Sequence, residues 1–176
     1  TPVRSKTTAK PKTRSAAKPV GQRAKTSIDP RILELQASAD QAFQAFEFAP
    51  ALDQYTQALD LLSAGGQAST PLACDLIFAQ GLCQRNLSDF PATIAAFEAA
   101  LHLARELRDV PRQVRSIVRL VEIMSAIGRA TEAQPLAKQA LQLARGIADR
   151  QLQADSLEAL GAAYIFLSDF AHAKEY

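Results

Sequence analysis

The sequence contains no tryptophan, only two cysteines and only 6% aromatic residues. It also has no run of about 18 apolar residues, the length that spans a bilayer, so we expect no membrane-crossing segment and no membrane partner. Because large side chains are scarce and alanine is frequent, helices can approach one another closely. The composition therefore favours stacked helices over a sheet.

Residues that carry enzyme chemistry are missing or scattered. The glycines form no phosphate-binding loop, and His102 and His172 have no Cys, His or carboxylate partner at metal-ligand spacing. No serine lies in a nucleophile motif. Asp155 and Glu158 share a helix face, but nothing in the sequence indicates a cleft around them. We therefore expect no cofactor and no metal site, and we expect that this chain alone is not an enzyme.

The two cysteines, Cys74 and Cys83, are predicted to lie on one helix. Nine residues of helix separate their positions by roughly 13 Å, which is too far for a disulfide. We expect buried, reduced thiols and a cytoplasmic location.

Charge is divided unevenly along the chain. Residues 1–27 carry eight basic side chains and no acid, whereas the remaining residues carry 12 basic and 18 acidic side chains, a net of −6. Residues 1–28 also hold almost no large apolar group, so we expect a disordered basic tail or linker. Two alternatives stay open. The tail could contact nucleic acid or anionic lipid weakly, or it could be a transit peptide that lacks the usual amphipathic stripe.

Two short motifs recur at fixed intervals. Leu87-Ser88-Asp89-Phe90 returns as Leu167-Ser168-Asp169-Phe170, 80 residues further on, and Ile127-Gly128-Arg129-Ala130 lies midway. Leu101-His102-Leu103-Ala104-Arg105 is echoed after 40 residues by Leu141-Gln142-Leu143-Ala144-Arg145. The spacing indicates an array of 40-residue units.

Start and stop signals divide residues 29–176 into helices. Asp and Thr are good N-caps, and Pro is tolerated in the first turn, as at Asp29-Pro30, Thr70-Pro71 and Asp109-Val110-Pro111. Glycines at 65–66, 128 and 146 are expected to mark helix ends. Pro135 is expected to make the start of its helix irregular. The predicted helices are 30–46, 49–64, 70–86, 90–107, 110–126, 130–146, 149–167 and 170–176.

Four units align over about 32–66, 74–107, 114–147 and a truncated 154–176. Position 8 is Ala39, Gly81, Val121 and Gly161; position 27 is Ala58, Ala100 and Ala140; position 28 is Leu in each complete unit. Small residues at positions 8, 20 and 27 would let the two helices of a unit cross closely. We expect Phe97 and Tyr55, at position 24, to fill the space between units.

This pattern resembles the tetratricopeptide repeat, in the 40-residue form found in kinesin light chain and in bacterial signalling proteins. Leu160-Gly161-Ala162-Ala163-Tyr164, followed by Asp169-Phe170 and Ala173, is the closest match. The departures are the missing Trp at position 4, the missing Pro near the end of the unit, and Val121 in place of a small residue. The resemblance implies an all-α fold, an α-solenoid of antiparallel helix-turn-helix repeats in a right-handed superhelix.

In that family, positions 2, 5, 9 and 12 of the first helix line a concave groove that holds peptides. They lie about 110° from the packing stripe at about 100° per residue. Phe78, Leu82 and Val118 could instead pack between units. The candidate groove residues are Gln36, Asp40, Phe43, Asp75, Phe78, Leu82, Arg85, Arg115, Val118, Glu122, Ser125, Asp155 and Glu158.

These residues predict a scaffold that binds a partner protein or an extended or helical peptide with an apolar anchor and basic groups. Acids at Asp40 and Asp75, beside Gln36, argue against the chaperone-type clamp for a C-terminal carboxylate. The alternative is a regulatory segment of a larger bacterial signalling enzyme or transcription regulator, with a diguanylate cyclase, histidine kinase, nucleotide cyclase or DNA-binding domain outside this chain. That alternative follows from the chain ending inside a predicted helix. The sequence leaves the oligomeric state open.

Overall fold

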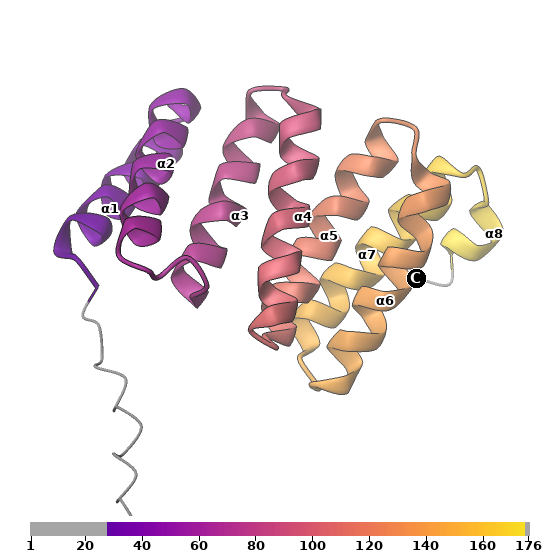
Figure 1. Cartoon of the computed structure of the whole chain (residues 1–176). Helices are drawn as coiled ribbons and strands as arrows, with labels where there is room; N and C mark the ends of the chain where they lie inside the picture. Colours follow the sequence, from indigo (N-terminus) through magenta and orange to yellow (C-terminus); the bar gives the residue numbers. More distant parts are fainter. Residues whose placement is uncertain (1–27, 175–176) are drawn as a thin grey trace, which may run out of the picture.

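The structure is a computed structural model that describes residues 28–174 (Figure 1). The expected basic tail lies outside these residues, apart from Ile28. The described residues form eight helices: α1 (Pro30–Gln44), α2 (Phe48–Ala64), α3 (Pro71–Asn86), α4 (Phe90–Glu106), α5 (Val110–Ala126), α6 (Ala130–Gly146), α7 (Arg150–Phe166) and α8 (Phe170–Ala173).

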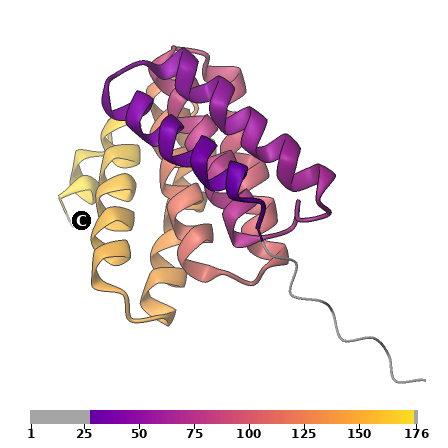
Figure 2. The same cartoon turned by 90° about the vertical axis from the view of Figure 1, so that its left-hand side faces the viewer.

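The helices stack in chain order as an α-solenoid. Each packs against the next one along the chain, and Figures 1 and 2 show the long helices as successive antiparallel pairs. Among the described helices, α5 and α7 are the one non-consecutive pair in extensive contact. None of these helices combines the length and the apolar character needed to cross a bilayer. The predicted all-helical array is therefore confirmed.

Every connection between helices contains one residue in the left-handed region. These residues are Phe46, Gly66, Ser88, Arg108, Gly128, Ala148 and Ser168, with φ between 55° and 86°. They recur every 20 residues, except for 22 between Gly66 and Ser88. A left-handed residue just after a helix lets orphan backbone groups form the closing hydrogen bonds. Because these residues recur regularly, α1 to α7 have similar lengths.

The recurring Leu-Ser-Asp-Phe motif is one such connection. Leu87 caps α3, Ser88 takes φ 63°, and the Asp89 carboxylate accepts a hydrogen bond from the Ala92 N–H at 3.1 Å to begin α4. Leu167, Ser168 and Asp169 repeat these roles between α7 and α8. The motif repeats in sequence because the turn repeats in space.

The helix bounds differ from those expected by more than one residue at two places. The first helix ends at Gln44 and not at residue 46, because Phe46 is left-handed. The last ends at Ala173 and not at residue 176, and residues 175–176 lie outside the described range. Gly146 is the final residue of α6, as expected, and the left-handed residue of the turn that follows is Ala148. The other bounds agree within one residue.

Pro135 lies inside α6, which nevertheless runs unbroken from Ala130 to Gly146. The Pro135 side chain is exposed, so the carbonyl that loses its N–H partner lies on the solvent side. The irregular start expected for this helix is not seen.

The tightest helix crossing lies within the second hairpin. A Cβ atom added at Gly81 on α3 would come within 2.7 Å of Cε1 of Phe97 on α4. Phe97 is fully buried, and Leu101 one turn later is 5% exposed. We expected the Phe97 ring between units, but it lies against Gly81 of its own hairpin. It also joins the apolar cluster that continues into α5.

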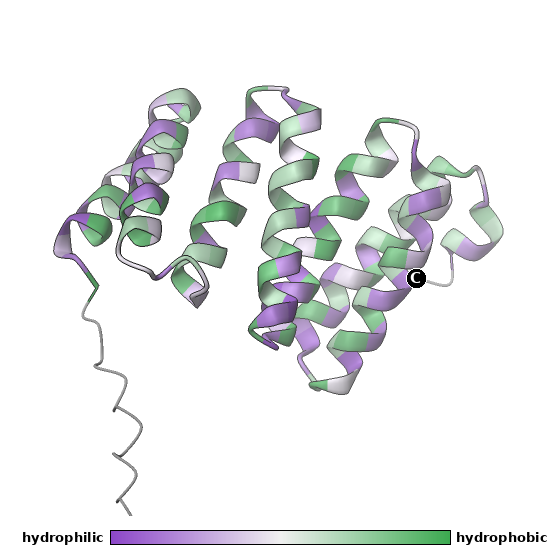
Figure 3. Cartoon of the chain, in the orientation of Figure 1, coloured by the Kyte–Doolittle hydropathy of each residue, from purple (hydrophilic) through white to green (hydrophobic). Residues whose placement is uncertain are grey.

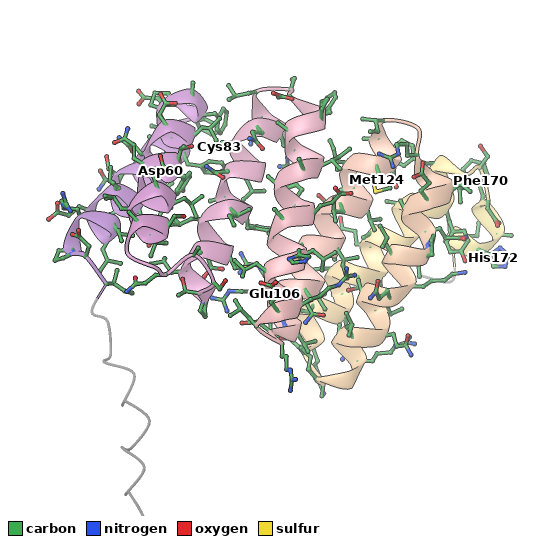
Figure 4. All side chains as sticks on the ribbon, viewed as in Figure 1. Asp60, Cys83, Glu106, Met124, Phe170 and His172 are labelled. Carbon is green, nitrogen blue, oxygen red and sulfur yellow. The ribbon has the colours of Figure 1, made fainter. Side chains whose placement is uncertain are left out.

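Two apolar clusters meet at α4. One joins α1 and α2 to α3 and α4, and the other joins α4 to α5, α6 and α7. Figure 3 shows hydrophobic and hydrophilic residues on every long helix, as amphipathic helices require, and Figure 4 shows Cys83 and Met124 on the ribbon. Cys74 and Cys83 are free and buried, as expected, and burial raises the pKa of the Cys83 thiol to about 11. Both therefore pack as apolar groups.

Gly81→Ala should destabilise the protein by about 1–2 kcal/mol, because the added methyl group must displace the Phe97 ring. Gly146→Ala is the matched control, since its Cβ would meet nothing within 4 Å. That control should be neutral or stabilising by about 0.5 kcal/mol through helix propensity. Urea unfolding of both variants measures the difference, and equal midpoints would contradict the close crossing.

Ala148→Gly should stabilise the protein by about 0.5–1 kcal/mol, because glycine removes the cost of a left-handed alanine. The reverse change at the equivalent turn, Gly128→Ala, should cost about 1 kcal/mol although its Cβ has open space around it. Thermal unfolding followed by circular dichroism tests the pair. Shifts of the same sign would show that turn geometry does not control stability here.

Candidate peptide-binding groove

A cleft of about 330 Å³ opens on the face formed by the first helices of the first three hairpins. Its walls come from α1, α3 and α5, with one side chain from α2. Seven of the thirteen candidate groove residues line it. The full lining is Gln36, Asp40, Phe43, Tyr55, Asp75, Leu76, Phe78, Ala79, Leu82 and Arg115.

The apolar part of the cleft is centred on Phe78. Its ring packs 5.3 Å from the buried Phe97 ring, between centroids, and the Arg115 guanidinium lies 4.8 Å above it. Phe78 and Leu82 are half-buried and pack against the core while still lining the cleft. Core packing and groove lining are therefore both true of these two side chains.

Asp40 supplies the acidic wall on the α1 side. The Tyr55 hydroxyl of α2 donates a hydrogen bond of 2.5 Å to Asp40 Oδ1. Burial, and then this hydrogen bond, raise the pKa of Tyr55 well above its ordinary value, so the phenol stays protonated. Within residues 28–174, no basic side chain forms a salt bridge with Asp40. Its negative charge is therefore available to a ligand.

Asp75 carries its own counter-charge. Arg112 of α5 donates to it from Nε at 2.9 Å and from Nη2 at 2.6 Å, and Arg115 Nη1 lies 3.9 Å away. These hydrogen bonds raise the pKa of Arg112, so the guanidinium keeps its positive charge. Asp75 is thus paired with a base that also binds Asp109, and the expectation that acids at these positions repel a carboxylate ligand stays a prediction.

Arg85 and Glu122 lie on the α3–α5 contact. Arg85 Nη1 is 3.5 Å from Glu122, and Arg119 Nη1 is 2.7 Å from the same carboxylate. Together with the Asp75–Arg112 pair, these contacts join α3 to α5 through charges.

The other candidate residues lie outside the cleft. Val118 and Ser125 of α5 are 5% and 1% exposed, so they belong to the interior where α5 packs on α7. The Ser125 hydroxyl has no hydrogen-bond partner. Asp155 of α7 accepts a hydrogen bond of 2.8 Å from Gln151, and neither it nor Glu158 lines the cleft.

Sequence reasoning missed Tyr55, Leu76 and Ala79 as lining residues. Tyr55 occupies a packing position of its helix, and only the fold turns its hydroxyl toward Asp40, 15 residues earlier. Leu76 and Ala79 flank the predicted groove positions on α3; Leu76 is buried and Ala79 is half-buried. Within the described residues no cluster of His, Cys, Asp and Glu could hold a metal ion.

Comparison with solved structures finds the same fold in BtubC (BKLC) from P. vanneervenii. The TM-score is 0.76 at 17% sequence identity, and the match covers 82% of this chain and 59% of the BtubC chain. This chain thus spans less than two thirds of that structure. No family model matches the sequence, and no curated protein does. At this identity the likeness shows the helical-repeat fold.

Asp75→Asn should destabilise the protein by about 1 kcal/mol, because it removes a two-point ion pair whose side chains are 34% and 27% exposed. The loss should shrink in high salt, which screens the pair in the parent protein. Asp155→Asn is the control, because Asp155 accepts its hydrogen bond from the neutral Gln151. Chemical unfolding at low and high salt measures both, and an equal effect of the two changes would contradict an electrostatic α3–α5 link.

Proposed function

We propose that this chain is a protein-interaction module of the tetratricopeptide type that acts by binding and not by catalysis. A peptide segment of a partner protein occupies the cleft between α1, α3 and α5. The observation that carries the proposal is the cleft itself, in which an apolar floor lies between polar walls from three different hairpins. Recognition clefts for peptides combine features of this kind.

The charges of the cleft indicate the chemistry of the ligand. Asp40 on the α1 side lacks a basic partner within the described residues, and Arg115 on the α5 side is shared between Asp75 and the Phe78 ring. This arrangement of charges fits a segment with a large apolar side chain on the cleft floor and a basic group toward Asp40. Such a segment can bind in an extended or a helical form.

Positions of the histidines support binding over catalysis. The expectation that neither histidine has a carboxylate partner is wrong, because His102 lies 3.7 Å from Glu106 on α4 and His172 lies 2.8 Å from Asp169 at the start of α8. Both are exposed and neither lines the cleft. Figure 4 places His172 at the outer edge of the array, on α8.

The test is a selection of binding peptides from a displayed random library against the full chain. For each selected peptide, Phe78→Ala combined with Leu82→Ala should weaken binding by at least about tenfold, because the apolar anchor loses its floor. Calorimetric titration measures the affinities, and circular dichroism checks that the variant keeps its helical signal.

The matched control truncates one aromatic and one aliphatic side chain on α7, outside the cleft. Ile165→Ala with Phe166→Ala changes side chains of α7 that are 54% and 57% exposed and distant in sequence from the cleft. This variant should bind the peptides unchanged. Selected peptides that bind the cleft variant as tightly as the parent would refute the proposed function.

A further inference from the structure

The α1–α2 turn carries an unusual side chain at its left-handed position. Gly66, Ser88, Gly128, Ala148 and Ser168 show that a small residue satisfies this geometry, and Arg108 is the one other long side chain. Phe46 takes φ 62° there and is 79% exposed. A bulky residue in this conformation raises the energy of the turn. Because Phe46 is so little buried, its packing contacts compensate for almost none of that energy. Folding of the chain does not account for Phe46.

Phe46 belongs to a row of three rings that leads into the cleft. Its centroid lies 6.1 Å from that of Phe48, edge to face, and Phe48 lies 5.3 Å from Phe43 in the same manner. Phe43 is also a wall of the cleft. We call Phe43, Phe46 and Phe48 the aromatic tip. It extends the apolar surface of the cleft beyond the end of α1.

The hairpin that carries the aromatic tip is strongly acidic. Residues 29–70 hold six acidic side chains and one basic side chain, whereas residues 108–148 hold three acidic and seven basic ones. The one base, Arg31, is bound to Asp29 at 2.6 Å. Figure 2 shows α1 and α2 side by side at the front. Within the described residues, the other acids of the hairpin have no salt-bridge partner; they are Glu34, Asp40, Glu47, Asp53 and Asp60.

We propose that the aromatic tip and the acids beside it dock a basic segment of a partner protein that carries an aromatic or large aliphatic side chain. The apolar side chain packs on Phe46 and Phe48, and lysines or arginines next to it face Asp40 and Glu47. Large apolar surface supplies affinity, and opposite charge supplies orientation and rate of encounter. This inference rests on the proposed function, because it names the chemistry of the segment that continues into the cleft.

The probe is a short fluorescein-labelled peptide rich in lysine with one central phenylalanine, used with the full chain. Two matched peptides replace the phenylalanine by alanine, or every lysine by glutamate. Fluorescence anisotropy should show the tightest binding for the first peptide. Raising the salt concentration should weaken that binding, since exposed charges are screened.

Phe46→Gly separates binding from folding. It should weaken binding of the lysine–phenylalanine peptide by at least about fivefold. The same change should raise the thermal midpoint of unfolding, because glycine suits the left-handed turn. Opposite signs of the two effects rule out unfolding as the cause of weaker binding. Phe166→Gly is the control, with a ring that is 57% exposed on α7, and it should leave the affinity unchanged.

Glu47→Lys tests the charge. It should weaken the same peptide by at least about threefold, whereas Glu158→Lys, the same charge change on α7, should not. Equal binding of the peptide with and without phenylalanine, or an unaltered affinity of Phe46→Gly, would overturn the inference. Self-association of the chain that disappears in Phe46→Gly would also overturn it, because the occupant is then a second copy. Loss of binding in Phe78→Ala with Leu82→Ala, but not in Phe46→Gly, would retain the cleft and reject the tip.

Discussion

The close crossing of the two helices in a hairpin is the constraint on which the rest of the structure depends. Gly81 lies so near the Phe97 ring that a single methyl group would overlap it, and Ala39 and Ala140 are fully buried at related positions. Because large side chains are excluded from these crossings, each hairpin is thin. Thin hairpins stack at short intervals and share a continuous apolar interior, which no single hairpin has enough surface to form alone.

Helix length is controlled separately, by the turns. One left-handed residue every 20 positions ends each helix, and an Asp or Thr begins most of the next ones. Equal lengths keep the hairpins in register over the whole array. The connection through Gly66, residues 65–70, lies between the first hairpin and the second and has six residues, whereas the other connections have three.

The contacts between the first helices of neighbouring hairpins determine which parts of the array surface are accessible. α5 packs directly on α7, which buries Val118 and Ser125 and closes that part of the predicted groove. α3 meets α5 through Asp75–Arg112 and Arg85–Glu122 pairs, and the cleft lies on that side. Apolar packing thus closes the α5–α7 interval, and ion pairs cross the α3–α5 interval beside the cleft. Both intervals have the same repeat pattern in sequence.

The repeat length, the helix bounds to within one or two residues, the turn motif and the all-helical fold follow from the sequence, because they depend on local propensities and on side-chain size at fixed spacing. The helix-face rule also selected residues of the cleft such as Asp40, Phe43 and Leu82. The tertiary structure decided which of the predicted positions remain accessible. It buried Val118, paired Asp75 with Arg112, and brought Tyr55 to Asp40 from another helix. These outcomes depend on distances between helices, which arise from the packing of the whole array and not from any one repeat.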